Sequence, residues 1–161
     1  MSDRWILNAS PLIVMGKIGQ IDLYAAIAQE IAVPSAVAEE IKAGPETDAA
    51  RLAIEAGKLP IVEAPPPSRE LLAWDLGAGE TAVISFATSN PGWTAILDDA
   101  AARKCANSFG VPVKGSLAVI VLAKKHGLIP SAKQVLRAMQ AAGLHLDEKL
   151  ISQILISVEE E

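Results

Sequence analysis

Short apolar runs alternate with longer segments of helical periodicity along most of the chain. The apolar runs end at proline, glycine or polar residues, and they predict strands at 5–7, 31–33, 60–62, 94–97 and 111–113. Apolar residues at helical spacing predict helices at 12–17, 21–30, 36–43, 68–74 and 80–89, one between Thr47 and Gly57, and one that follows Asp98-Asp99 and ends at Phe109. The chain after 113 is predicted to be helical, with turns at 127–130 and 143.

The strand pattern predicts the fold class. Strands that are apolar throughout, separated by helices, are typical of a parallel sheet covered on both faces. We therefore expect a three-layer α/β/α sandwich with a short parallel sheet of about five strands, and Pro60 predicts that the third strand lies at an edge. Composition does not change across Pro65-Pro66-Pro67, so residues 1–161 are expected to form a single domain in which 130–161 is a helical C-terminal extension.

Composition and charge limit the function. The 161 residues carry a formal net charge of −5, which argues against a broad basic surface, so any contact with nucleic acid must be local. The apolar run 117–123 is far shorter than the ~18 residues of a membrane span, and no secretory signal is visible. We expect a cytoplasmic protein that does not contact a membrane. The single cysteine, Cys105, is expected to be a core residue in a reducing compartment.

Polar side chains gather where predicted strands end. Ligands bind at the carboxyl ends of parallel strands, and hard cations such as Mg²⁺ or Mn²⁺ need oxygen ligands. Six residues follow strands or lie early in neighbouring helices, namely Asn8, Ser10, Glu40, Glu80, Asp98 and Asp99. Their carboxylates would repel one another without a cation. Simpler roles also fit: Glu40 as a solvated helix residue, Glu80 at a helix N-terminus, and Ser10 or either aspartate as a helix cap.

Several short motifs in a fixed order resemble those of PIN-domain proteins over about residues 5–140, and more closely those of a prokaryotic PIN subgroup. They are Leu7–Ile13, Val33–Ile41, Gly79–Ala82, Ile96–Arg103, Lys114–Val119 and Ala123–Pro130. The resemblance implies a metal-dependent ribonuclease fold, often the toxin of a bacterial toxin–antitoxin pair. It also implies an RNA substrate and a possible antitoxin partner, and we expect the protein to be a homodimer.

The resemblance assigns residues to roles. The four acidic positions of the family fall on Asn8, Glu40, Glu80 and Asp99, and Ser10 matches the small hydroxyl residue that steadies the first of them. Glu40, Glu80, Asp98 and Asp99 are the implied ligands of one or two Mg²⁺ or Mn²⁺ ions, which polarise a phosphodiester and activate a water. Arg103 and Lys104, with Lys124-Lys125, are basic residues that could meet an RNA backbone, or they could be scattered solvated charges.

Asn8 departs from the family pattern, which usually has aspartate there. An amide oxygen can bind a cation but brings no charge, so both weakened or specialised catalysis and its loss stay open. The alternatives to a ribonuclease are a PIN-fold module that binds nucleic acid or a partner without catalysis, and a receiver-like phosphoacceptor domain. A receiver places its acidic pair after the first strand, whereas Asp98-Asp99 follows the fourth.

An apolar stripe near the C-terminus has two possible roles. We expect it to pack on the core or to form a homodimer or antitoxin-facing surface, because large apolar patches usually meet a partner. Its residues are Leu150, Ile151, Ile154, Leu155, Ile156 and Val158.

Overall fold

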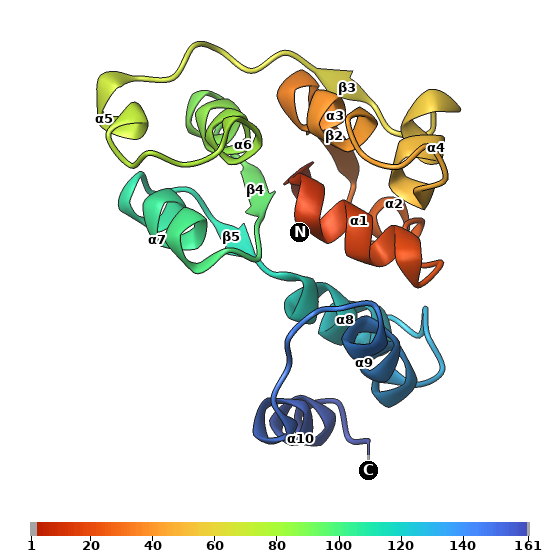
Figure 1. The fold of residues 1–161 in the computed structure, drawn as a ribbon. Helices are drawn as coiled ribbons and strands as arrows, with labels where there is room; N and C mark the ends of the chain where they lie inside the picture. Colours follow the sequence, from red (N-terminus) through yellow and green to blue (C-terminus); the bar gives the residue numbers. More distant parts are fainter. Residues whose placement is uncertain (1–2, 161) are drawn as a thin grey trace.

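The computed structural model describes residues 3–160, which contain a five-stranded, all-parallel sheet flanked by helices (Figure 1). The strands occur in the order β3-β2-β1-β4-β5 and span Arg4–Leu7 (β1), Glu30–Pro34 (β2), Ile61–Val62 (β3), Trp93–Ile96 (β4) and Val113–Lys114 (β5). The central strand β1 pairs with both β2 and β4, and Leu7 is in register with Ile96. The predicted α/β class is confirmed, and β3 lies at an edge as expected.

The helices agree with the predicted ones to within a few residues in most places. They are α1 (Ala9–Lys17), α2 (Leu23–Ile27), α3 (Ser35–Lys42), α4 (Ala49–Glu55), α5 (Arg69–Leu72), α6 (Ala78–Ser89), α7 (Ala100–Ser108), α8 (Ser116–Lys125), α9 (Ala132–Ala141) and α10 (Glu148–Ser157). The prediction of helix over 21–30 was too long. Gln29 donates its backbone N–H to Asp3 at 2.7 Å, and Glu30 pairs with Arg4 in the sheet, so strand pairing ends the helical segment early.

The apolar strands form the middle of the core because helices cover both of their faces. Trp5, Ile6 and Leu7 are fully buried, which explains why β1 lacks the alternation of a half-exposed strand. The Trp5 ring meets Tyr24 edge-on at 6.3 Å between centroids, and the Tyr24 hydroxyl donates to the Pro11 carbonyl at 3.0 Å. Cys105 is buried, as predicted. None of the helices in residues 3–160 is both long and apolar enough to cross a lipid bilayer.

The C-terminal helices pack on the same core. Ile151, Ile154 and Leu155 are buried, and Leu150 and Val158 are partly buried against the core cluster. Ile156 faces away and is 75% exposed. Packing on the core therefore accounts for most of the predicted apolar stripe.

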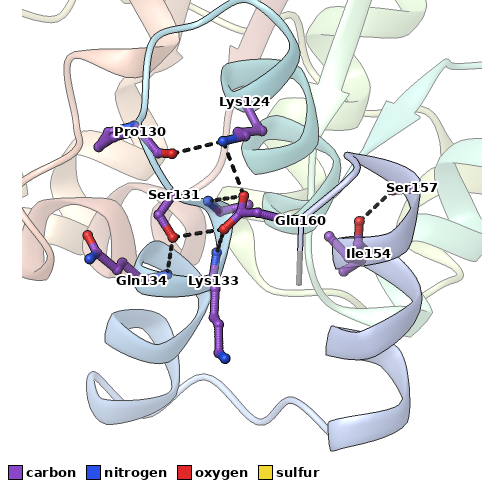
Figure 2. Close-up of polar contacts among 9 residues, drawn as sticks. Lys124, Pro130, Ser131, Lys133, Gln134, Ile154, Ser157 and Glu160 are labelled. Carbon is purple, nitrogen blue, oxygen red and sulfur yellow. Dashed lines mark hydrogen bonds and ion pairs between the residues drawn. The ribbon is translucent and has the colours of Figure 1, made fainter.

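Glu160 fixes the end of this region to the first turn of α9 (Figure 2). Its carboxylate accepts the backbone N–H groups of Ala132 at 2.7 Å and Lys133 at 3.1 Å, and the Ser131 hydroxyl at 2.8 Å. The Lys124 ammonium lies 3.4 Å from Glu160 Oε2. An anion at a helix N-terminus is stabilised by the unpaired N–H groups there. Burial alone would raise the pKa of Glu160, but these donors outweigh it and lower that pKa to about 2.

Glu160→Gln is expected to lower the melting temperature at pH 7 by about 3 °C, from the loss of about 1 kcal/mol of charge-assisted hydrogen bonding. The carboxylate stabilises the fold above its unfolded pKa, near the ordinary value of 4.5, and this contribution is lost as the pH falls toward about 2. The difference in melting temperature between the variant and the parent protein should therefore shrink as the pH falls below 4.5. Glu159→Gln, at the exposed neighbouring residue, is the matched control. An equal effect at Glu159, or a gap independent of pH, would contradict this assignment.

Candidate functional site

Six polar residues converge on one cavity at the carboxyl ends of β1 and β4. The cavity has a volume of about 380 Å³ and is lined by Asn8, Ser10, Glu40, Glu80, Asp98 and Asp99. The register of β1 with β4 places Leu7 beside Ile96, so the residues after each strand emerge together. Helices α3 and α6 contribute the two glutamates. The structure therefore brings together all six residues that the sequence singled out, while their chemical roles stay predictions.

Asn8 is the innermost residue of this cavity. Its backbone N–H donates to the Ile96 carbonyl at 3.3 Å, which ties the end of β1 to the end of β4. The residue is only 5% exposed, and its side chain does not cap α1. The side-chain Oδ1 is buried and has no hydrogen-bond partner. Since buried polar atoms almost always have a partner, this oxygen is available to a ligand.

Ser10 is not the helix cap that the sequence suggested. Helix α1 begins at Ala9, so Asn8 occupies the cap position, and Ser10 and Pro11 both lie within the first turn. Proline is tolerated there because the first N–H groups of a helix have no intrahelical partner. Ser10 is exposed and lines the cavity, and within residues 3–160 it makes no hydrogen bond to Asn8.

Glu80 lies in the first turn of α6 and has the most perturbed carboxyl of the cavity. Its Oε2 is buried without a hydrogen-bond partner. Burial raises the pKa of Glu80, the negative charges of Asp99 and Glu40 raise it further, and the Gly77 backbone N–H only partly opposes the shift. A favourable helix N-terminus alone would lower this pKa. Three carboxylates therefore lie close enough to repel one another.

Gly79 explains how Glu40 reaches the same place. A Cβ atom on Gly79 would lie 2.8 Å from Glu40 Oε1 and 3.4 Å from Asn8 Oδ1. Glycine at this position of α6 therefore leaves room for both oxygens beside the helix backbone. Glu40 itself is exposed on α3, at the rim of the cavity.

Of the two aspartates only Asp99 is a helix cap, and Asp98 instead bonds to the first residue of a helix further along the chain. Asp99 Oδ2 accepts the Ala102 N–H at 2.9 Å and caps α7. Asp98 accepts the backbone N–H of Ser116 at 2.7 Å and its hydroxyl at 2.5 Å, at the start of α8. Both oxygens of Asp98 are thus occupied, whereas Asp99 uses one. Asp99 is consequently the better placed of the two to bind a ligand.

Ser116 is a residue that the sequence analysis missed as part of the site. It is fully buried and joins Asp98, after β4, to the helix that follows β5. The only sequence signal was its place in the Lys114–Val119 motif, since a contact over 18 residues leaves no local pattern.

The basic residues that could meet an RNA backbone lie in separate groups. Arg103 and Lys104 are both exposed on α7, and Arg103 Nη1 donates to the Leu97 carbonyl at 3.5 Å. Lys124 is bound to Glu160 and to the Pro130 carbonyl. It lies eight residues after Ser116 in α8, which is about 12 Å along the helix axis. Lys124 therefore does not join Arg103 in one group.

The donors of the cavity suit a hard cation. Carboxylate and amide oxygens are the ligands of Mg²⁺ and Mn²⁺, and two of them, Asn8 Oδ1 and Glu80 Oε2, are buried without a partner. In the part of the chain from 3 to 160, no three His, Cys, Asp or Glu side chains are gathered closely enough to hold a metal ion. The evidence for a cation is thus the pair of unpartnered oxygens and not a formed ligand cage.

The all-parallel sheet with an acidic cavity at its carboxyl edge defines a Rossmann-like α/β protein. The family model DUF3368, described as a PIN domain, matches residues 4–160, and the chain belongs to this PIN-domain family. The match confirms the resemblance drawn from the motifs and includes α9 and α10. No curated protein matches the chain. The receiver hypothesis is set aside, because the sheet order differs from the 2-1-3-4-5 order of that fold, and because the residue that follows β1 is Asn8 and not an acid.

Proposed function

We propose that this protein is a ribonuclease of the PIN type that depends on Mg²⁺ or Mn²⁺. The observation that supports the proposal best is the pair of buried, unpartnered oxygens, Asn8 Oδ1 and Glu80 Oε2, in a cavity that also holds Glu40 and Asp99. Leaving buried oxygens unpaired and carboxylates close together is costly, and a divalent cation relieves both costs. RNA as the substrate rests on the resemblance to the family.

The residues of the cavity would divide the work. Glu40, Glu80 and Asp99 would hold the cation, and Asn8 would add a neutral oxygen ligand. Asp98, held through Ser116, would keep the end of β4 and the start of α8 in place. When bound, the cation would polarise the phosphodiester and lower the pKa of a water that attacks phosphorus. Ser10, exposed at the cavity, would contact the substrate.

A second candidate is a PIN-fold module that binds RNA or a partner without cleaving it. Asn8 favours this candidate, since replacing a carboxylate by an amide removes one negative charge from the metal site. The two candidates differ in whether bound RNA is hydrolysed when Mn²⁺ is present.

The biological role follows from the resemblance and is a separate proposal. We propose that the protein is the toxin of a toxin–antitoxin pair, that it acts in the cytoplasm as a homodimer, and that an antitoxin protein restrains it. Expression of the chain alone should arrest growth, and co-expression with the product of an adjacent short gene should restore it. Normal growth with the chain alone would count against the toxin role but not against the nuclease.

Saturating Mn²⁺ is expected to raise the melting temperature, because a ligand that binds only the folded state stabilises it. At a concentration one hundred times the dissociation constant, the gain is about 2.7 kcal/mol, or roughly 5–10 °C for a chain of this size. Glu40→Gln should reduce the shift, whereas Glu39→Gln, at the exposed neighbour outside the cavity, should not. A melting temperature indifferent to Mn²⁺ and Mg²⁺ would contradict the metal site, and single-stranded RNA left intact under these conditions would contradict the nuclease.

A further inference from the structure

Two further cavities adjoin the acidic cavity. One, of about 330 Å³, shares Ser10 and Glu40 with it. The other, of about 310 Å³, shares Asp98 with it. The two outer cavities also have Leu144 in common, which lies on the connection between α9 and α10. That connection runs beside the start of α8 (Figure 1). The acidic cavity therefore has a neighbouring cavity on two sides, with shared lining residues, and the α9–α10 connection borders both neighbours.

Each outer cavity is lined by a positively charged side chain and lies beside the acidic cavity. Lys17, the last residue of α1, lines the first cavity, is exposed, and forms no ion pair within residues 3–160. Arg103 and His145 line the second. The Arg103 guanidinium lies over Gly115, and the lack of a Cβ there leaves room for it at the cavity. The chain thus places one cation in each outer cavity, Lys17 in the first and Arg103 in the second, next to a site proposed to bind a phosphate.

The remaining walls are apolar and fit the other parts of a nucleotide. Leu117, Leu146 and Leu150 line the second cavity, and Ile13 and Val14 line the first. Both volumes lie at the small end of the range for ligand cavities. Unpaired bases stack on planar side chains such as histidine and arginine, and phosphates pair with cations.

We propose that the two outer cavities are subsites that bind the nucleotides on either side of the phosphate held in the acidic cavity. The α9–α10 turn, residues 142–146, forms a wall common to both subsites. The inference rests on the proposed nuclease function and adds that the RNA substrate is single-stranded. The ligand is a single strand, because bases must leave a duplex to reach such walls. It also explains how a chain of net charge −5 holds a polyanion, with a few cations placed along its path instead of a basic surface.

The test is binding of a 5′-fluorescein-labelled hexauridylate, followed by anisotropy in Ca²⁺ between 50 and 200 mM KCl. Lys17→Gln and Arg103→Gln should each weaken binding about fivefold and reduce the slope of log K against log salt by about 0.7, the value for one phosphate contact on a single strand. His145→Ala should weaken binding about fivefold through lost stacking, with the slope unchanged. The matched controls are Lys58→Gln and His126→Ala, at exposed residues outside the three cavities, and neither should change binding.

The outcomes separate the inference from the proposed function. Binding with the expected slopes but without cleavage in Mn²⁺ supports the subsites and contradicts the nuclease. Cleavage with binding unchanged in all three variants overturns the subsites and leaves the nuclease in place. Equal affinity for duplex RNA, or no binding of hexauridylate at 50 mM KCl, also overturns the subsites. Thermal melts of each variant confirm that it is folded.

Discussion

Glu80→Gln is expected to reduce Mn²⁺-dependent RNA cleavage by about 10²–10³-fold and, in the absence of metal, to raise the melting temperature by about 2–4 °C. Glu80 Oε2 is buried without a partner, and Asp99 and Glu40 lie close enough to raise its pKa. Replacing the carboxylate by an amide of the same shape removes the repulsion that destabilises the metal-free protein. The same change removes a charged ligand from the cation, so stability and activity should move in opposite directions.

The measurement combines two assays on the same preparations. Cleavage of a labelled single-stranded RNA gives the rate, and melts with and without Mn²⁺ give the stability. Glu70→Gln is the matched control, since Glu70 is also in the first turn of a helix but is exposed on α5. A variant that is destabilised without metal would show that the Glu80 charge is satisfied in the fold. Cleavage at the parent rate would show that Glu80 takes no part in the reaction.

The meeting of the acidic residues in one cavity could be predicted in part from local sequence patterns. Asn8 and Asp99 follow buried strands, and the carboxyl ends of parallel strands meet at one edge of a sheet, so their proximity follows once β1 and β4 are adjacent. Helical periodicity alone could not assign Glu40 and Glu80 to the site, because an exposed glutamate in a helix is usually only solvated. The order of the motifs and the resemblance to PIN domains supplied that step.

Contacts between distant segments could not be predicted. Glu160 bonds to Ser131 over 29 residues, and Asp98 bonds to Ser116 over 18, and nothing near either residue in sequence marks its partner. Gln29 and Glu30 continue a helical pattern, yet they pair with Asp3 and Arg4 at the start of the central strand β1. In each case a tertiary hydrogen bond decides a feature that local preferences leave undetermined.

Asn8→Asp is expected to increase the affinity for Mn²⁺ by about tenfold and to raise the cleavage rate, while lowering the melting temperature of the metal-free protein. Asn8 is 5% exposed and its Oδ1 lies close to Glu40 Oε1 across Gly79, so a charge there would be buried among carboxylates. Without metal that charge has no partner and costs stability. With metal it becomes a charged ligand in place of a neutral one, and the attraction to the cation exceeds the cost.

The melting temperatures of the variant and the parent protein, plotted against Mn²⁺ concentration, should therefore cross. The variant should be less stable than the parent protein at low Mn²⁺ and more stable at saturation. Asn107→Asp, on the exposed face of α7, is the matched control and should shift neither end of the titration. A variant less stable at every Mn²⁺ concentration, with RNA still uncleaved, would show that the remaining carboxylates do not form a metal site. In that case the neutral oxygen at Asn8 would belong to a surface for binding RNA or a partner, and the two candidate functions would be separated by one substitution.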